Sequence, residues 1–337
     1  MLSYKPKLKL RAVAILRNEL DVLPLFLRHC DALFDEVFLV DHRSIDGSRE
    51  LIMEAVTQRK HWTYYQMDSN FFLQEQVLNF LIDRFSADDF DYLFLLDADE
   101  FIIAKSRKEL ETRLIETPRE PNEVFCFNWV NAINRKSLVN EKLSPRSNFL
   151  VSNEESIFTK VVLPINLIKE KNIRVSLGHH VGFDKSQNPI TMKPLGKMLH
   201  LPIRSRRQLI KKAITMEFKN ILNNEVNPGE SYQFKRFLEL FLQDGLSVKS
   251  MVSALALYQF GEPIIPLDWV EKFLTEGSFT SKLKKVPIAF DSSLKLKNLK
   301  NDVPIEKIFA DLLLENRQIA PSQQTLRLEG NRLLLNT

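Results

Sequence analysis

Short apolar runs alternate with segments of helical spacing over residues 10–103, and this alternation constrains the fold more than any other feature of the sequence. Four runs have the length and composition of β-strands: 11–16, 37–40, 62–66 and 92–96. Three segments repeat apolar residues with the period of a helix: 21–33, 49–56 and 74–85. Chains with this order form parallel sheets covered by helices on both faces. We therefore predict an α/β fold with a mainly parallel, doubly wound sheet flanked by helices.

The chain beyond residue 103 predicts more strands, followed by a helical region. Strands are expected at 123–130 and 158–163, with a polar loop at 136–152 between them. A basic helix is expected at 206–222, and one or two further helices within 232–260. We place a boundary near residue 220, so that residues 1–220 form the α/β domain. Residues 221–337 then form a mostly helical C-terminal region with a polar tail from Pro321.

The composition excludes some classes of protein. The 337 residues are 44% hydrophobic, enough to bury a sizeable core, and the net charge of +4 falls short of the dense basic field that nucleic-acid binding requires. The two cysteines, Cys30 and Cys126, lie in apolar runs and are interpreted as buried side chains, which fits a reducing cytoplasm. No apolar run approaches 18 residues. We expect a cytoplasmic protein, so any membrane association would be peripheral.

Polar residues directly follow three of the predicted strands. Arg17, Asn18 and Glu19 follow the first, Asp41 to Ser44 the second, and Asp97 to Glu100 the fourth. In open α/β sheets, ligands bind beyond the carboxyl ends of the strands, where the strand order reverses. These residues are therefore the first candidates for a binding site.

The acidic segment Asp97-Ala98-Asp99-Glu100 predicts a divalent metal site. Carboxylates crowded at the rim of a sheet repel one another, and Mg²⁺ or Mn²⁺ would relieve that repulsion through oxygen ligands. If the ligand is a nucleoside diphosphate sugar, the metal bridges the two phosphates and neutralises charge on the leaving diphosphate. The alternative is that Asp97 caps a helix while Asp99 and Glu100 are solvated. Placement directly after a buried strand favours the metal site.

The segment around Asp41 has features of a base-binding turn. A carboxylate at Asp41 would accept the N3 proton of a uracil ring, while Ser44 and Asp46-Gly47 shape the turn. For Asp46 and Ser48 we favour a role in capping the following helix.

Together these segments resemble the glycosyltransferase family 2 superfamily of the GT-A fold, especially its branch with a D-x-D-E-F motif. The resemblance covers about residues 10–215. Its motifs are short but agree in order and spacing, and they are Leu16-Arg17-Asn18-Glu19, Val40-Asp41 through Asp46-Gly47-Ser48, Phe94 through Phe101, Gly178-His179-His180 and Leu199 through Ser205.

The resemblance implies that residues 1–220 form a nucleotide-sugar-binding domain. Asp41 would contact the base, Asp97 would contact the ribose or a metal-bound water, and Asp99 would ligate the metal. The residues that would line the nucleotide pocket are Leu16, Arg17, Asn18 and Glu19.

The downstream motifs imply further contacts. His200 would be another metal ligand, beside Asp97 and Asp99, or a phosphate contact, although a histidine satisfied inside the core is an equal alternative. Of His179 and His180, at most one would point into the site if they lie on a strand. Arg204 would pair with the diphosphate through its planar fork, or belong to a solvated basic face.

The general base of the family pattern is not plainly present. Its nearest counterpart is Glu155, which would deprotonate the acceptor hydroxyl, although Ser152 and Glu155 also have the spacing of a capping box. Inverting stereochemistry is favoured by the resemblance but stays open. Trp129, with Asn128 and Asn131, would contact an acceptor sugar or belong to the core.

The sequence thus predicts a metal-dependent glycosyltransferase, with Mn²⁺ or Mg²⁺, that moves a sugar from a nucleoside diphosphate donor to a hydroxyl of a glycan or lipid-linked acceptor. UDP is favoured as the nucleotide through Asp41 and the resemblance. The alternatives are a phosphatase of the haloacid dehalogenase type, or a non-catalytic module that binds a nucleotide or a glycan. The C-terminal helical region would cover an acceptor groove, form a dimer or touch a membrane surface, and the sequence does not choose among these.

Overall fold

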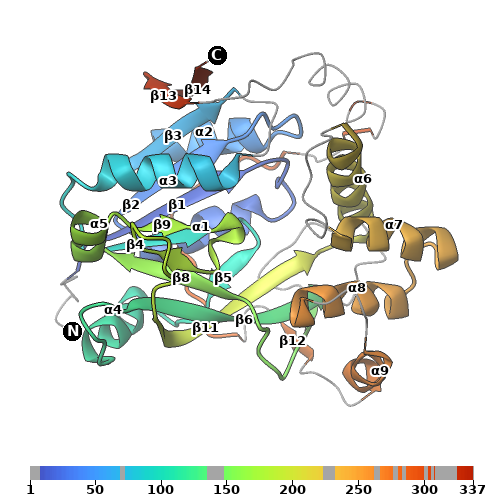
Figure 1. The fold of residues 1–337 in the computed structure, drawn as a ribbon. Helices are drawn as coiled ribbons and strands as arrows, with labels where there is room; N and C mark the ends of the chain where they lie inside the picture. The colour runs from blue at the N-terminus through green and yellow to red at the C-terminus, as the bar shows by residue number, and fades with distance from the viewer. Residues whose placement is uncertain are drawn as a thin grey trace.

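The fold is described from a computed structural model of the chain (Figure 1). The structure describes residues 8–68, 73–134, 148–222, 232–261, 266–275, 280–282, 286–299, 303–304, 307 and 325–336.

A single large mixed sheet runs through the molecule. Its main path has the order β12-β7-β6-β8-β4-β1-β2-β3-β14-β13, and β11 and β5 pair beside it. The strands on the first half of the chain are β1 (Leu10–Leu16), β2 (Glu36–Asp41), β3 (Trp62–Met67), β4 (Tyr92–Leu96), β5 (Glu100–Ile102) and β6 (Val124–Asn134). The later strands are β7 (Asn148–Val151), β8 (Thr159–Pro164), β11 (Met192–Ile203), β12 (Thr280–Lys282), β13 (Thr325–Glu329) and β14 (Arg332–Asn336). A separate small pair joins β9 (Arg174–Val175) to β10 (Gly182–Phe183).

The centre of the sheet is parallel, and its strand order reverses at β1. β1 pairs in parallel with β2 on one side and with β4 on the other, while β2 pairs in parallel with β3. The chain therefore builds outward from β1 to β3 and then returns to the other side of β1. The carboxyl ends of β1 and β4 flank the resulting crevice, which is where open α/β sheets bind ligands.

The second half of the sheet brings β11 against the acidic segment that follows β4. β8 lies antiparallel between β4 and β6, and β11 pairs in parallel with β6 and antiparallel with β5. In this register His200 lies opposite Glu100, and the backbone N–H of Leu201 donates to the carbonyl of Asp99 at 2.8 Å. Residues a hundred positions apart in the chain thus meet at one end of the sheet.

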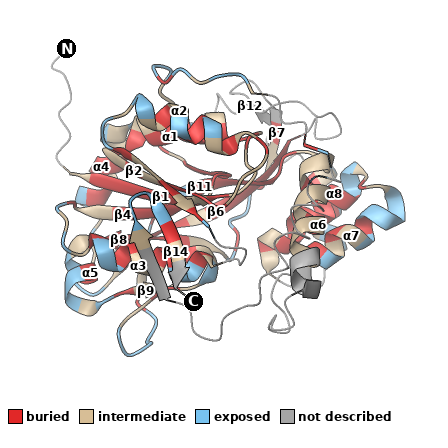
Figure 2. Ribbon diagram, turned by 90° about the horizontal axis from the view of Figure 1, so that it is seen from above, coloured by how far each residue is buried: buried red, intermediate tan, exposed pale blue. Residues whose placement is uncertain are grey.

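Helices cover both faces of the parallel strands (Figure 2). On one face lie α1 (Leu23–Leu33), α2 (Ser48–Thr57) and α4 (Arg107–Glu116), and on the other α3 (Gln74–Phe85) and α5 (Ile165–Lys171). The alternating residues of β1 show the division: Ala12 and Ala14 pack with the first group of helices, and Val13 packs with the second. This two-sided burial explains why the strands read as continuous apolar runs. The predicted fold class is confirmed.

A third core forms where helices pack against the ends of β6 and β11. These helices are α6 (Arg206–Leu222), α7 (Tyr232–Asp244), α8 (Val248–Phe260) and α9 (Leu267–Thr275), and they lie together at one side of the sheet (Figure 1). Their buried residues, such as Phe237 and Met251, surround Ile133 of β6 and Ile203 of β11. No helix of the described ranges is both long and apolar enough to cross a bilayer.

The C-terminal region also contributes strands, which the sequence analysis did not predict. β12 pairs with β7, and β13 and β14 form a hairpin whose second strand pairs in parallel with β3. The tail, which we had interpreted as polar, therefore extends the sheet. β12 and β14 pair with strands far away in the sequence, β7 and β3, whereas Gly330-Asn331 between β13 and β14 is a local hairpin signal that was overlooked.

One buried histidine ties residues 286–299 to the main core. The ring of His29 is fully buried, its Nδ1 lies 3.0 Å from the carbonyl oxygen of Ala289, and its Nε2 accepts from the backbone N–H of Ile102 at 2.9 Å. This pattern requires a neutral ring with the proton on Nδ1. Burial lowers the pKa of His29 from 6.5 to about 4.

Acidification is therefore expected to weaken the fold through His29. Between pH 6.5 and 4 the unfolded chain binds a proton at this position that the native state does not, so stability falls as the pH falls. At pH 5 the loss relative to pH 7 is about 2 kcal/mol from this group. Urea unfolding at the two pH values measures it. The acid-induced loss should be smaller in His29→Gln, and an equal loss in both proteins would contradict the assignment.

Candidate active site

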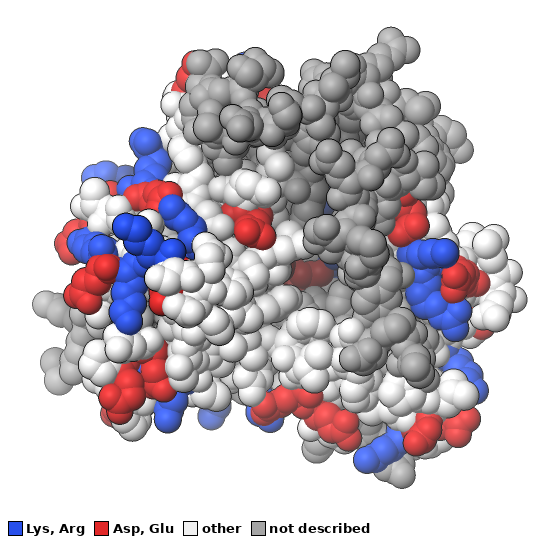
Figure 3. All heavy atoms as spheres, in the orientation of Figure 1, with Lys and Arg blue, Asp and Glu red and all other residues white. Residues whose placement is uncertain are grey.

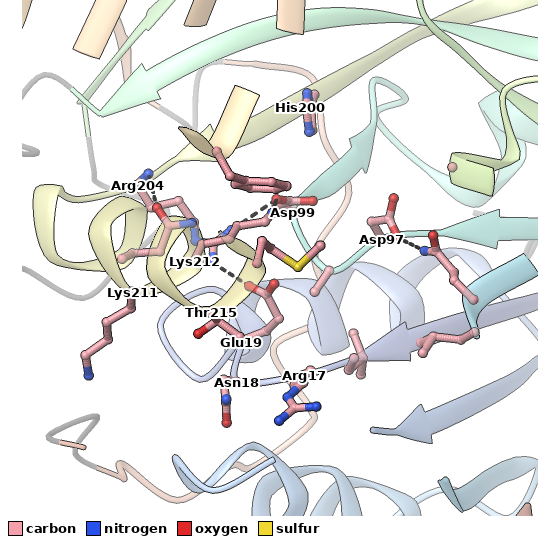
Figure 4. Close-up of a pocket in the computed structure, with 18 of the residues that line it drawn as sticks. Arg17, Asn18, Glu19, Asp97, Asp99, His200, Arg204, Lys211, Lys212 and Thr215 are labelled. Carbon is pink, nitrogen blue, oxygen red and sulfur yellow. Dashed lines mark hydrogen bonds and ion pairs between the residues drawn. The ribbon is translucent and has the colours of Figure 1, made fainter. Parts of the chain in front are cut away.

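A cavity of about 510 Å³ opens beyond the carboxyl ends of β1 and β4. The turns after these two strands form part of its wall, α6, α7 and α8 contribute another part, and aromatic residues from β6, β11 and the segments beside β8 contribute the rest (Figure 4). The site residues predicted from the sequence that line this cavity are Leu16, Arg17, Asn18, Glu19, Asp97, Asp99, His200 and Arg204. The topology thus brings three separate motifs to one place.

The first acidic residue, Asp97, is held by two partners. Its Oδ2 accepts from Lys160 Nζ at 2.5 Å, and its Oδ1 accepts from the amide of Gln74 at 3.0 Å. Burial raises the pKa of Asp97, but the neighbouring charge of Lys160 outweighs burial and holds this pKa well below its usual range. Asp97 therefore stays ionised, with both oxygens engaged.

Glu100 lies beneath the cavity rather than on its wall. Its side chain is fully buried, its Oε2 accepts from the backbone N–H of Asp97 at 2.9 Å, and Lys160 Nζ lies 3.2 Å from its Oε1. Burial raises the pKa of Glu100 well above its usual range. The three carboxylates expected at the rim of the sheet are therefore divided. Asp97 and Asp99 line the cavity, and Glu100 is buried behind them.

The second acidic residue, Asp99, belongs to a different network, centred on Arg204. The guanidinium of Arg204 is 2% exposed, and it donates to Asp99 at 3.1 Å, to Asp21 at 2.9 and 3.1 Å, and to Glu19. Each of the three nitrogens of Arg204 therefore already has a carboxylate acceptor. Arg204 thus acts as a clamp that joins the turns after β1 and β4. Because each of its nitrogens already donates to a carboxylate, none is left to bind a diphosphate.

Lys212 is the more accessible cation beside this clamp. It projects from α6 towards Asp99, with its Nζ 3.8 Å from an oxygen of that carboxylate, and its side chain is 32% exposed (Figure 4). Burial raises the pKa of neighbouring Glu19 to about 7, although the charges of Arg204 and Lys212 act in the opposite direction. The carboxylates of this wall are thus balanced by cations from α6 and from the turn before it.

His200 has the hydrogen bonding of an imidazole whose Nε2 can accept. Its Nδ1 lies 2.8 Å from Oδ1 of Asn131, and the amide nitrogen of Asn131 donates to Tyr258 and Gln259, so the proton of His200 is assigned to Nδ1. Burial lowers the pKa of His200 to about 3, which keeps the ring neutral. A ring oriented by a hydrogen bond from its other nitrogen is the usual arrangement of a histidine that binds a metal.

Three predicted site residues do not line the cavity: Asp41, Ser44 and Glu155. Asp41 is fully buried and its oxygens lie 3.3 Å from the backbone N–H of Ser44, while Ser44 Oγ accepts from the N–H of Asn18 at 2.9 Å. Both side chains organise the turn behind the cavity, and the neighbouring His42, Ile45 and Asp46 form its surface instead.

Glu155 lies outside the cavity lining and is exposed at the molecular surface. Its carboxylate accepts from the amide of Asn128 and pairs with Lys197 at 2.9 Å. Its hydrogen bonds with Asn128 and Lys197 lower its pKa. The capping-box alternative is wrong, because residues 152–157 are not helical and Ser152 Oγ instead contacts the backbone of Glu154.

Trp129 lines the cavity without offering an open ring face. Its ring is 5% exposed and stacks on His200, with ring centroids 3.8 Å apart and planes at 23°. His180 and Phe158 pack against it at centroid distances of 4.9 and 5.6 Å. A sugar therefore cannot stack on Trp129 as arranged here, and the residue orients the two histidines instead.

Lys160, Lys212 and Tyr258 were not among the site residues predicted from the sequence. Lys160 had a signal, because a lysine in the middle of an apolar strand requires buried acidic partners. Lys212 had been grouped with a basic helix face. Tyr258 lies in α8, and its buried hydroxyl has no hydrogen-bond partner among the described residues, although it lines the cavity. No local signal connects it to the acidic segment.

The described residues fit a metal held jointly with a substrate. Within the described ranges, no group of three or more His, Cys, Asp or Glu side chains is arranged to hold an ion. Mg²⁺ in nucleotide sites, however, takes one or two carboxylates, and phosphate oxygens and water complete its shell. Asp99 and His200 both line the cavity. Their backbones lie side by side, because His200 pairs with Glu100 and the N–H of Leu201 donates to the carbonyl of Asp99. Asp97 is less suited, because both of its oxygens are engaged.

Comparisons with known proteins yield only distant structural similarities. A search against protein-family models found no match, and a search of curated proteins found none either. Among solved structures, a mannosyltransferase from Pyrobaculum calidifontis in complex with GDP-Man and Mn²⁺ aligns over 80% of this chain and 85% of its own, with 14% identity and a TM-score of 0.34. The bifunctional glycosyltransferase WbbM aligns over 56% of this chain and 32% of its own, with 12% identity and a TM-score of 0.24. Neither similarity assigns a substrate or a residue role to this chain.

Proposed function

We propose that this protein is a glycosyltransferase that binds a nucleoside diphosphate sugar and a divalent metal in the cavity at β1 and β4. The observation that carries the proposal is the meeting of Asp97, Asp99 and His200 in a cavity at the point where the strand order reverses. The cavity volume of about 510 Å³ lies within the range of pockets that bind small organic ligands and cofactors.

The charges around the cavity suit a ligand that is itself anionic. Lys212, whose Nζ lies 3.8 Å from Asp99, and Arg17 both line the cavity, so a diphosphate there would meet cations as well as the metal carboxylate (Figure 4). On the face drawn in Figure 3, blue and red side chains are interspersed among the coloured residues, and no continuous basic field is visible. The described residues of the cavity therefore suit a small anionic ligand.

In this proposal the turns after β1 and β4 orient the donor. Arg204 fixes the carboxylates of Glu19, Asp21 and Asp99 relative to one another, and Asn18 fixes the turn after β2 through its bond to Ile45 N–H at 2.8 Å. Asp99 and His200 would hold Mn²⁺ or Mg²⁺, which supplies Lewis-acid stabilisation of the leaving diphosphate when bound. UDP would be the nucleotide by the resemblance of the sequence motifs, because Asp41 lies outside the cavity lining and does not itself select a base. The acceptor would be a hydroxyl of a glycan or a lipid-linked molecule.

Thermal denaturation with nucleotides tests the proposal. UDP with Mn²⁺ is expected to raise the Tm of the wild-type protein more than UDP or Mn²⁺ alone, because a ligand that binds only the native state stabilises it by mass action. GDP with Mn²⁺ tests the base preference. In Asp99→Asn, the increment added by Mn²⁺ should disappear, whatever the Tm of the unliganded variant.

Two controls give this experiment its specificity. Ca²⁺ without nucleotide measures non-specific stabilisation by a divalent ion, and Asp244→Asn removes an exposed carboxylate in α7 that lies outside the cavity lining. The proposal is abandoned if no nucleoside diphosphate raises the Tm in the presence of any divalent metal. Release of free phosphate from a phosphomonoester, without any requirement for a nucleotide sugar, would support the phosphatase instead.

A further inference from the structure

His180 lies in the wall of the cavity with one ring nitrogen anchored. Its Nδ1 lies 2.6 Å from the carbonyl oxygen of Thr159, and Thr159 Oγ1 donates to the carbonyl of His180 at 3.0 Å. Because a carbonyl only accepts, the proton of the neutral ring is on Nδ1 and the lone pair is on Nε2. Two reciprocal bonds to the start of β8 thus fix both the tautomer and the orientation of the ring.

The space next to Nε2 of His180 is kept free of a side chain by Gly178, two residues earlier in the chain. Gly178 has φ +76, and a Cβ built on it would lie 2.7 Å from His180 Nε2. The described part of the chain gives Nε2 no hydrogen-bond partner, and Gly178 and His180 both line the cavity. Glycine therefore serves two purposes here: it adopts the left-handed backbone and leaves room in front of a basic nitrogen.

The position of His180 relates it to the proposed donor site. Its ring centroid lies 4.9 Å from that of Trp129, and the ring centroid of His200 lies 3.8 Å from that of the same Trp129. One aromatic ring thus separates His180 from a candidate metal ligand. The adjacent His179 is different, because it is 1% exposed and its Nδ1 lies 3.1 Å from Lys160 Nζ beneath the cavity.

We propose that His180 is the general base that removes the proton from the attacking acceptor hydroxyl, an assignment that rests on the proposed transferase function. The acceptor oxygen forms a bond to the anomeric carbon of the donor sugar, and the bond from that carbon to the diphosphate oxygen breaks, with its electron pair leaving on the diphosphate. The hydroxyl proton passes to Nε2 of His180 and then to water. The products are the glycoside, the nucleoside diphosphate and one proton.

The state of the ring agrees with this role. Burial lowers the pKa of His180 to about 4, so the imidazole is neutral and able to accept a proton at neutral pH. Its basicity is then close to that of a carboxylate. Glu155, the base expected from the sequence, is paired with Lys197 and Asn128 outside the cavity lining, whereas the lone pair of His180 lies in the cavity wall.

The test follows nucleotide-sugar turnover with water as the acceptor. UDP-glucose, UDP-galactose and GDP-mannose are incubated with the wild-type protein and Mn²⁺, and release of the nucleoside diphosphate is measured. With the donor that turns over fastest, His180→Gln is expected to lower kcat at least about 100-fold. The thermal shift given by UDP or GDP with Mn²⁺ should be retained, because the substitution removes a base and not the nucleotide site.

Two further variants separate a base from a structural role. His180→Gly should be inactive, and added imidazole should restore part of its activity by occupying the vacated space, which a structural defect would not allow. Gly178→Ala, which places a methyl group against Nε2, should lower kcat while keeping the thermal shift. His61→Gln is the matched control, because it makes the same change at an exposed histidine and should leave turnover unaltered.

The outcomes distinguish failure of this inference from failure of the proposed function. If the wild-type protein neither binds a nucleoside diphosphate nor releases one from a donor, the transferase function and this assignment fall together. If the wild-type protein turns over and His180→Gln is equally active, only the assignment to His180 falls. A loss of turnover in Glu155→Gln without one in His180→Gln would likewise overturn it.

Discussion

Replacing Lys160 with methionine is expected to lower the free energy of unfolding by about 3–5 kcal/mol at pH 7. The lysine side chain is 1% exposed, and its ammonium group contacts Asp97, Glu100 and His179. Methionine fills much of the same volume but leaves two neighbouring acidic groups without their shared cation. Breaking a buried pair by removing one partner costs more than the pair itself contributes. Urea unfolding followed by circular dichroism measures the loss.

The cause of that loss can be separated from simple repacking. Lys197→Met removes a lysine whose side chain is 52% exposed and whose ion pair with Glu155 lies at the surface, so a change of no more than about 1 kcal/mol is expected. Adding Asp97→Asn to Lys160→Met should recover part of the stability, because Asp97 is the acid that stays ionised and the substitution makes it neutral. Equal effects of Lys160→Met and Lys197→Met would show that the buried charge network is not what stabilises this region.

Replacing Arg204 with methionine is expected to cost about 3–5 kcal/mol of stability and to abolish nucleotide binding. The guanidinium is almost fully buried and joins carboxylates of two separate turns, Glu19 and Asp21 after β1 and Asp99 after β4. Without it, three carboxylates repel one another at the mouth of the proposed donor site. Urea unfolding and the Mn²⁺-dependent thermal shift given by UDP measure the two effects.

Arg204→Lys separates the effect of the positive charge from that of the planar guanidinium group. Arg204→Lys keeps the positive charge but loses the planar fork that bonds Asp21 through two nitrogens, so it should recover only a small part of either effect. Arg236→Gln, at a surface pair with Glu239 in α7, is the matched control and should be nearly neutral. Nucleotide binding that survives in Arg204→Met would show that the clamp does not shape the donor site.

Much of the α/β domain could be predicted because its signals are local. The helix predicted at 74–85 and the strand predicted at 92–96 match α3 (Gln74–Phe85) and β4 (Tyr92–Leu96). Burial on both faces gives a parallel strand a continuous apolar run, and burial on one face gives a helix its period. The hairpin of β13 and β14 has a local signal in Gly330-Asn331, but its attachment to the sheet through β3 depends on a strand far away in the sequence.

The placement of the candidate site was predicted better than the orientation of its side chains. Asp97 and Asp99 follow β4 directly, so the topology carries them to the crevice at β1. Asp41 is likewise at the end of a strand, as the last residue of β2, yet its carboxylate is turned into the loop and bonds Ser44. The position of a residue after a strand determines where its backbone lies in the fold. The direction of its side chain depends on the group to which that side chain hydrogen-bonds.

The order of strands and helices, and the strand ends at which acidic residues emerge, were determined by the sequence alone, because apolar period and chain order are local properties. Only the tertiary structure decided the partners: Lys160 beneath Asp97, Arg204 across two turns, and His180 on the carbonyl of Thr159. These contacts join residues tens to hundreds of positions apart. A buried charge or an imidazole acquires its state from neighbours at a few ångströms, and those neighbours exist only once the chain has folded.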